Sequence, residues 1–142
     1  MPMTDLYTLL VALGLGCAIG LERKLNDHSA GIHTHALVAL GSALFIMLGA
    51  KLAAPTETAR VASQVVMGIG FLGAAVIMRN GMRVRGLNTA VTIWCSSAIG
   101  AIAGAGLTML ACEGAALIVI TNFVLHLVEH RSGWFRSPPE QK

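Results

Sequence analysis

Few side chains in this sequence could carry out chemistry, and they lie among long apolar stretches. His126 and His130 are one helical turn apart, a spacing that can bind a transition metal. However, no Glu directly follows His126, as the metalloprotease motif H-E-x-x-H would require. Mg²⁺ prefers oxygen ligands to imidazole, and neither a Ser-His-Asp set nor paired carboxylates are apparent. We therefore expect no metal site, no cofactor and no enzymatic activity.

A polar stripe lies in the segment 88–96. Asn88 and Thr89 begin it, and Ser96 follows Thr92 at helical spacing, so that these last two side chains share a face. Polar groups inside an apolar span cost free energy and are candidates for function. Two interpretations remain open: Asn88 caps a helix whose polar face makes interhelical hydrogen bonds, or the stripe contacts a partner or an ion.

Three further polar side chains lie within or at the end of apolar segments. Glu22 and Arg23 are adjacent, so they cannot share one helix face. We expect Glu22 to point inward to another partner and Arg23 to reach the lipid headgroups. Gln64 lies about one turn into the third apolar segment and is a candidate for a partner contact.

Five apolar segments must position these side chains, and each is about as long as a bilayer crossing requires. Charged residues make up 12% of the 142 residues, about half the share in soluble domains. The segments are 4–22, 34–53, 60–79, 88–107 and 108–129, with a turn near Gly104 and Gly106. The sequence therefore predicts an all-α integral membrane protein, a bundle of about five transmembrane helices over 1–130 with a short basic tail at 131–142.

The distribution of basic residues predicts the orientation of the bundle. With five spans, and with Arg79 taken together with the 80–87 loop, eight of the ten Lys and Arg residues fall on the side that holds the 23–33 loop, the 80–87 loop and the tail. Lys51 and Arg60 fall on the other side. Because positive residues remain cytoplasmic, we expect the N-terminus outside and the C-terminus inside. The net charge of +3 is too small and dispersed for a nucleic-acid binder.

Small residues at helical spacing predict close contacts between the helices. Seven glycines are expected to serve this packing: Gly16, Gly20, Gly68, Gly70, Gly73, Gly100 and Gly104. The run GIGFLG at 68–73 matches the dinucleotide pattern G-x-G-x-x-G, but it lies in mid-span without a preceding strand. We therefore expect a tight bundle, which could also associate with further copies of itself.

The run QVVMGIGFLGAAVIMRNGMRVRGLNTAVTIWCS at 64–96 resembles the MgtC/SapB family of bacterial inner-membrane proteins, and its virulence-associated members in particular. GLER at 20–23, THALVALGSALF at 34–45 and RVASQVV at 60–66 support the resemblance in the expected order. The likeness extends over about 10–128, and it implies a multi-pass protein of the inner membrane with a periplasmic N-terminus and a cytoplasmic C-terminus.

The resemblance also implies a function. Such a protein would be a virulence factor needed for growth at low Mg²⁺ and for survival inside macrophages. It would modulate a membrane ATPase, notably the membrane sector of the F-type ATP synthase, and the membrane potential. Asn88 and Cys95 match functionally important residues of the family's GLNTAATLWCS segment, and we expect them to contact the partner, supported by Gln64, Glu22 and Thr92. The alternative is a small transporter or channel for Mg²⁺ or protons.

Some positions depart from the family pattern. His33 stands where the family usually has Arg, Ala75 replaces a glycine of GFLGAG, and Asn80 replaces an acidic residue. Many relatives also carry a soluble C-terminal domain of ACT-like fold, which this sequence does not contain. We therefore expect the function of this chain to reside in its membrane domain.

Overall fold

Five long α-helices and one β-hairpin form the part of the chain that the structure, a computed structural model, describes: residues 2–26, 28–52, 55–80 and 83–132. The helices are α1 (Pro2–Leu25), α2 (Ile32–Leu52), α3 (Pro55–Ala75), α4 (Leu87–Gly104) and α5 (Thr108–Ser132). Strands β1 (Met78–Asn80) and β2 (Arg83–Arg85) lie between α3 and α4. Each helix is long and apolar enough to cross a membrane, which confirms the predicted all-α membrane bundle.

The connection between α3 and α4 differs from its prediction. The apolar segment was expected to remain helical to 79, but α3 ends at Ala75 and the chain forms an antiparallel hairpin in which Arg79 pairs with Val84. Gly86 then turns the chain into α4 with a φ of 84°, a left-handed conformation that glycine adopts without strain. A Cβ at this position would also lie 2.0 Å from the carbonyl oxygen of Val76, so the close return of the chain needs a glycine.

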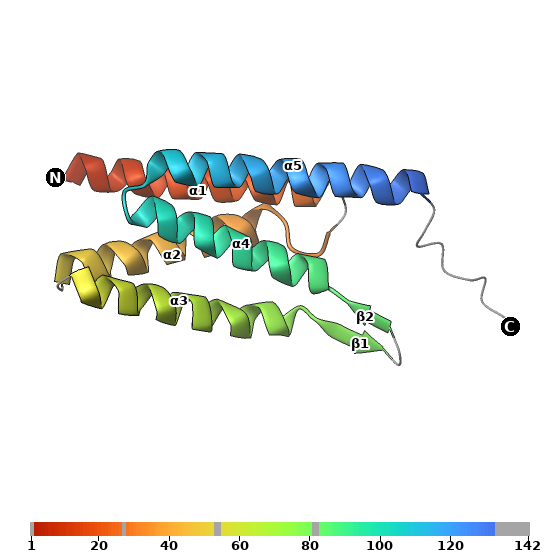
Figure 1. The fold of residues 1–142 in the computed structure, drawn as a ribbon, viewed down its shortest axis with the longest axis horizontal. Coiled ribbons are helices and arrows are strands. Elements are labelled where there is room, and N and C mark those ends of the chain that lie inside the picture. Colours follow the sequence, from red (N-terminus) through yellow and green to blue (C-terminus); the bar gives the residue numbers. More distant parts are fainter. Residues whose placement is uncertain (1, 27, 53–54, 81–82, 133–142) are drawn as a thin grey trace, which may run out of the picture.

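Helices α1, α2 and α4 form the centre of the bundle, with α5 against α1 and α4 and with α3 against α2 and α4 (Figure 1). The hairpin, the α1–α2 connection and the C-terminal end of α5 lie at one end of the bundle (Figure 1). We call this end the hairpin end. At the opposite end, the side chains of Lys51 and Asp5 form an ion pair that joins α2 to α1.

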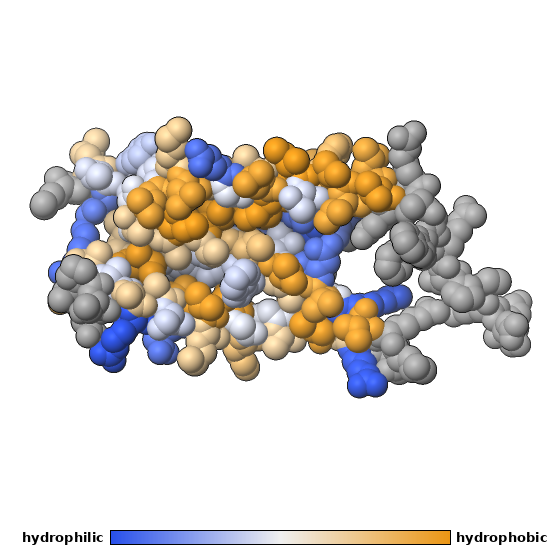
Figure 2. Space-filling model, in the orientation of Figure 1, coloured by the Kyte–Doolittle hydropathy of each residue, from blue (hydrophilic) through white to orange (hydrophobic). Residues whose placement is uncertain are grey.

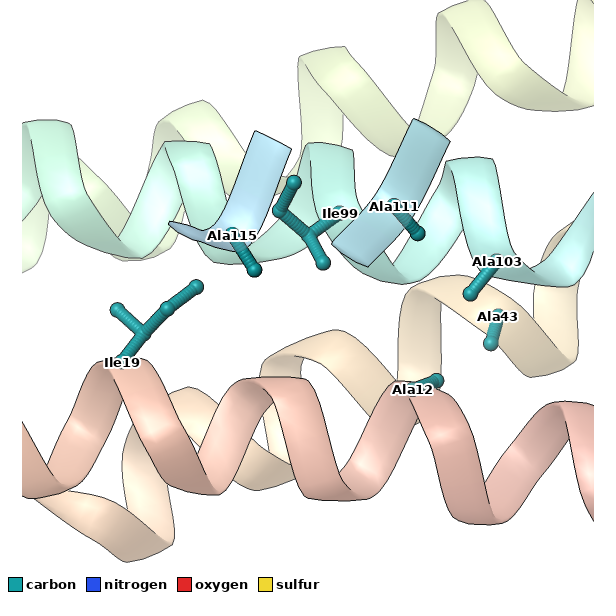
Figure 3. Packing of buried hydrophobic residues seen from close by; sticks show 7 residues of the cluster. All are labelled: Ala12, Ile19, Ala43, Ile99, Ala103, Ala111 and Ala115. Atoms are coloured by element: carbon teal, nitrogen blue, oxygen red, sulfur yellow. The ribbon is translucent and has the colours of Figure 1, made fainter. Parts of the chain in front are cut away.

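The interior of the bundle is built from small side chains. One buried cluster contains Ala12, Ile19, Ala43, Ile99, Ala103, Ala111 and Ala115 (Figure 3). Half of the residues in the α4 span are buried, against 11% in the α3 and α5 spans. Figure 2 shows the resulting hydrophobic surface over α5, with the most hydrophilic residues mainly toward the two ends of the molecule.

Four of the seven glycines lie where two helix backbones approach each other. A Cβ on Gly16 would lie 2.6 Å from the carbonyl oxygen of His35, and one on Gly20 would lie 2.6 Å from Ile32 Cα. These contacts join α1 to α2. Helix α4 also approaches α2 closely, since a Cβ on Gly100 would lie 2.0 Å from the Ala39 carbonyl oxygen. A Cβ on Gly104 would lie 2.6 Å from the Ala43 carbonyl oxygen.

The glycines of α3 are placed differently. Gly68 and Gly70 are exposed, and a Cβ on either would meet no heavy atom within 4 Å, so the expected packing role is not found in the described chain. The buried face of α3 instead runs through Ile69 and Gly73, which are four residues apart, and Gly73 is in ordinary contact range of Ala90. Gly68 and Gly70 flank Ile69 on either side of this face.

Candidate functional site: a buried polar cluster and the outer face of α4

Buried and partly buried polar side chains gather where α1, α2, α4 and α5 meet, toward the hairpin end. We define the polar cluster as Glu22, Arg23, Asn26, His35, Ser96 and Asn122. Ionisable groups inside membrane-spanning segments are rare, because their burial costs free energy, and they commonly mark functional positions. The cluster is therefore the first candidate for a site in this bundle.

Glu22 points inward, as expected, and is 8% exposed. Its Oε1 accepts a hydrogen bond of 2.6 Å from Asn26 Nδ2, and its Oε2 accepts one of 3.2 Å from Asn122 Nδ2 on α5. Both carboxylate oxygens are thus bonded to neutral amides. Asn122 was not identified from the sequence, in which it is one polar residue within the long apolar run of α5.

The prediction that Arg23 reaches the lipid headgroups is wrong. Arg23 is 2% exposed, and its Nε and Nη2 atoms are buried without a hydrogen-bond partner among the described residues. The reason lies in helix geometry. Arg23 follows Gly20 by three residues and Gly16 by seven, so it shares the face of α1 that packs on α2. The close approach of Gly20 to Ile32 brings the start of α2 over this side chain.

His35 lies in the second predicted span, 34–53, and its side chain is inside the bundle. It is fully buried, and its Nδ1 lies 2.8 Å from Ser96 Oγ on α4. Its Nε2 has no partner among the described residues. The alanines that follow at positions 36, 39 and 43 share this buried face, and this spacing is the signal that could have placed His35 there. His33, by contrast, is exposed.

The remaining histidines, His28, His126 and His130, lie outside the polar cluster. His28 lies in the α1–α2 connection, outside the spans; burial lowers its pKa, and the positive charge of Arg23 lowers it further. His126 is exposed on α5, and the side chain of His130 lies outside the described residues. Among the residues that the structure describes, no group of three or more His, Cys, Asp or Glu could hold a metal ion.

The polar stripe of α4 is divided between the interior and the surface. Thr89, Thr92 and Ser96 are buried, and Thr92 Oγ1 donates a hydrogen bond of 2.9 Å to the Asn88 carbonyl. The Asn88 side chain is exposed, and it does not cap the helix, because Gly86 occupies the N-cap position without a side-chain hydrogen bond. Cys95 is half-buried.

Asn88 and Cys95 nevertheless lie on the same face of α4. They are seven residues apart in α4, which places them on one helix face two turns apart. Val91, three residues after Asn88, is exposed between them. We call the stripe formed by Asn88, Val91 and Cys95 the outer face of α4. The remaining candidate, Gln64, is exposed on α3 and lines a cavity with Ser97, away from this face.

Comparisons with known proteins cover most of the chain. The family model of the MgtC family matches residues 9–131. Protein MgtC of Salmonella typhimurium (strain 14028s / SGSC 2262) is 47% identical over 126 residues, which are 89% of this chain and 54% of that protein. Protein MgtC of Brucella abortus (strain 2308) is 45% identical over 111 residues, 78% of this chain and 47% of the relative.

A more distant relative is an uncharacterised protein of Synechocystis sp., 41% identical over 121 residues, or 85% of this chain and 52% of that protein. This chain thus spans about half the length of the curated relatives that it matches. No solved structure matches it. The family model and the identity to relatives from separate genera agree over most of the helical bundle, and the chain therefore belongs to the MgtC family.

Proposed function

We propose that this chain is the membrane domain of an MgtC-like virulence factor, needed for growth at low Mg²⁺ and for survival inside macrophages. It would act without catalysis, by binding a membrane ATPase or the membrane sector of the F-type ATP synthase. The observation that carries the proposal is the 47% identity to Salmonella MgtC over 126 residues. That length corresponds to most of the bundle and is matched by the family model from residue 9 to residue 131.

The geometry supports a contact surface on α4. The outer face combines an exposed amide, Asn88, with an exposed apolar side chain, Val91, and the half-buried thiol of Cys95. Polar and small side chains are common in contacts between membrane helices. Ser96 and Ser97 are buried and hydrogen-bond to His35 and Ser42, which anchors α4 to α2. A partner helix on the outer face could therefore bind without disturbing the interior.

A bound partner can be regulated only through differential affinity. If the outer face binds one conformation of the ATPase more tightly than the other, the equilibrium shifts toward that conformation, and equal affinity shifts nothing. We propose that binding takes place in the bacterial inner membrane, with the hairpin end in the cytoplasm. Lys24, Arg79 and Arg85 are exposed at this end, which supports that orientation under the positive-inside rule.

The replacement Asn88→Ala tests this function. We expect a strain that depends on this chain to lose growth at low Mg²⁺, because the amide that faces the partner is gone, while the amount of chain in the membrane stays normal. Growth is measured at limiting and at replete Mg²⁺, with Thr121→Ala, a change at an exposed polar residue of α5, as the control. Full growth of a normally inserted Asn88→Ala variant would contradict the assignment.

One observation favours a second function, a proton or Mg²⁺ transporter. Glu22, Arg23 and His35 place buried ionisable groups within the membrane-spanning segments, as proton pathways require. This alternative predicts proton or Mg²⁺ flux into liposomes that contain the purified chain, and loss of the flux in Glu22→Gln. The proposed regulatory function predicts no flux in either protein.

A further inference from the structure

A cavity of about 520 Å³ lies between α2 and α3, and α4 reaches it with Ser97. Most of its lining is apolar, including Leu37, Phe45 and Leu72, which are exposed. These residues belong to spans long and apolar enough to cross a membrane. The cavity is therefore accessible from the side of the bundle that would face lipid.

Two glycines keep this space open. Gly41 of α2 and Gly68 of α3 both line the cavity, and a Cβ on either would meet no heavy atom within 4 Å. The same two helices approach each other elsewhere, since a Cβ on Gly49 would lie 3.1 Å from Val61 Cγ2. The cavity is thus a local separation of α2 and α3, flanked by a point of contact.

The polar groups of the cavity are few. Ser42 Oγ and Ser97 Oγ are bonded to each other at 2.7 Å, and both side chains are buried. The Gln64 amide is exposed on the lining and can donate to a ligand. Moving a charged or strongly hydrated ligand into such a space would cost several kcal/mol without compensating partners. A ligand for this site must therefore be mainly apolar, with at most one polar group near Gln64.

The volume distinguishes a hydrocarbon chain from a protein helix. With a diameter of about 10 Å and a pitch of 5.4 Å, one helical turn occupies roughly 400 Å³. The cavity could hold little more than one turn of the roughly 20 residues that a partner helix needs to cross the bilayer. Its size instead falls within the range of about 300–1,000 Å³ typical of small-ligand sites. A narrow chain fits this space better than a helix.

We propose that this cavity binds one acyl chain of a membrane phospholipid. The chain lies between α2 and α3 and fills the space that Gly41 and Gly68 leave. Gln64 is six residues into the span Thr58–Ala75 and donates a hydrogen bond to the ester carbonyl at the polar end of the chain. Gln64 is then a lipid-binding residue rather than part of the outer face of α4. The site does not depend on the identity of any protein partner.

Photolabelling from a lipid acyl chain tests whether the cavity holds such a chain. The chain is reconstituted into vesicles of phosphatidylethanolamine and phosphatidylglycerol that contain a phospholipid with a photoreactive diazirine in one acyl chain. After irradiation, labelled residues are identified by mass spectrometry. We expect strong labelling of the lining residues Val38 and Val65, above the level at Leu117, an exposed residue of α5.

Gly68→Leu fills the cavity and should reduce labelling of Val38 and Val65 to the level of Leu117. Gly70→Leu is the control, because Gly70 is equally open and exposed but does not line the cavity. Equal labelling of the cavity and α5 in the unaltered chain, or labelling unchanged by Gly68→Leu, would overturn the proposal. So would protection of the cavity by a polypeptide in native membranes.

A second pair of variants tests the same prediction if the Gly68→Leu chain does not insert into the membrane. Gly41→Leu fills the cavity from α2, and Gly14→Leu, at an open position of α1 outside the cavity, is its control. Gln64→Leu should retain the label but spread it along the helix axis, because the ester is no longer held. A label distribution that is identical in Gln64→Leu would contradict the role of the amide.

Discussion

Gly100→Ala is expected to destabilise the bundle by about 1–3 kcal/mol or more, the range for forcing extra atoms into a well-packed interior. The added Cβ would lie 2.0 Å from the carbonyl oxygen of Ala39, and a backbone atom cannot rotate away as a side chain does. The contact could be relieved only by separating α4 from α2. The measurement is the free energy of unfolding of the purified chain in detergent, from a denaturant titration.

The control for this prediction is Gly14→Ala. A Cβ on Gly14 meets nothing within 4 Å, and alanine favours a helix by about 1 kcal/mol over glycine, so this variant should be as stable as the unaltered chain or more stable. If Gly100→Ala and Gly14→Ala unfold at the same denaturant concentration, the contact between α2 and α4 is not as the structure describes it.

Glu22→Gln should cost about 3 kcal/mol of stability, because it leaves Arg23 as an uncompensated buried charge. The guanidinium is 2% exposed, and two of its nitrogens have no hydrogen-bond partner among the described residues. The Glu22 carboxylate is the adjacent negative charge, and two amides hold it in place. Without that carboxylate, the positive charge of Arg23 loses its adjacent counter-charge in an interior of low dielectric constant.

The double variant Glu22→Gln/Arg23→Met tests whether the buried charge of Arg23 causes the loss of stability. Methionine fills a comparable volume without a charge, so the double variant should regain most of the lost stability, and Arg23→Met alone should be milder than Glu22→Gln. The four proteins form a double-mutant cycle, measured by the same denaturant titration. Additive effects of the two replacements would show that the two charges do not compensate each other.

The spans could be predicted from the sequence because a bilayer imposes a minimum apolar length. The turn near Gly104 and Gly106 is also confirmed: α4 ends at Gly104, and Gly106 has a φ of 82°. The hairpin was not predictable in this way, because its strands are three residues each and Val76, Ile77 and Met78 continue the apolar segment of α3 in composition.

The burial of individual polar side chains was less predictable than the helices themselves. Composition places Arg23 at the end of a span. The start of α2 covers this end because Gly20 allows α2 to approach α1 closely, a contact that composition does not show. His35 lies close to the charged α1–α2 connection in sequence, yet the close packing of α1 and α4 against α2 buries it. The tail expected at 131–142 lies outside the described residues from 133 onward.

The most direct test of the proposed regulatory function is to cross-link and purify the tagged chain from cells grown at low Mg²⁺. Proteins bound to it are then identified by mass spectrometry, in parallel for the unaltered chain, Asn88→Ala and Thr121→Ala. We predict recovery of an ATPase or of an ATP-synthase membrane subunit with the unaltered chain and with Thr121→Ala, and its loss with Asn88→Ala. Recovery of the chain alone, or of the same ATPase with all three proteins, would contradict a partner contact through the outer face of α4.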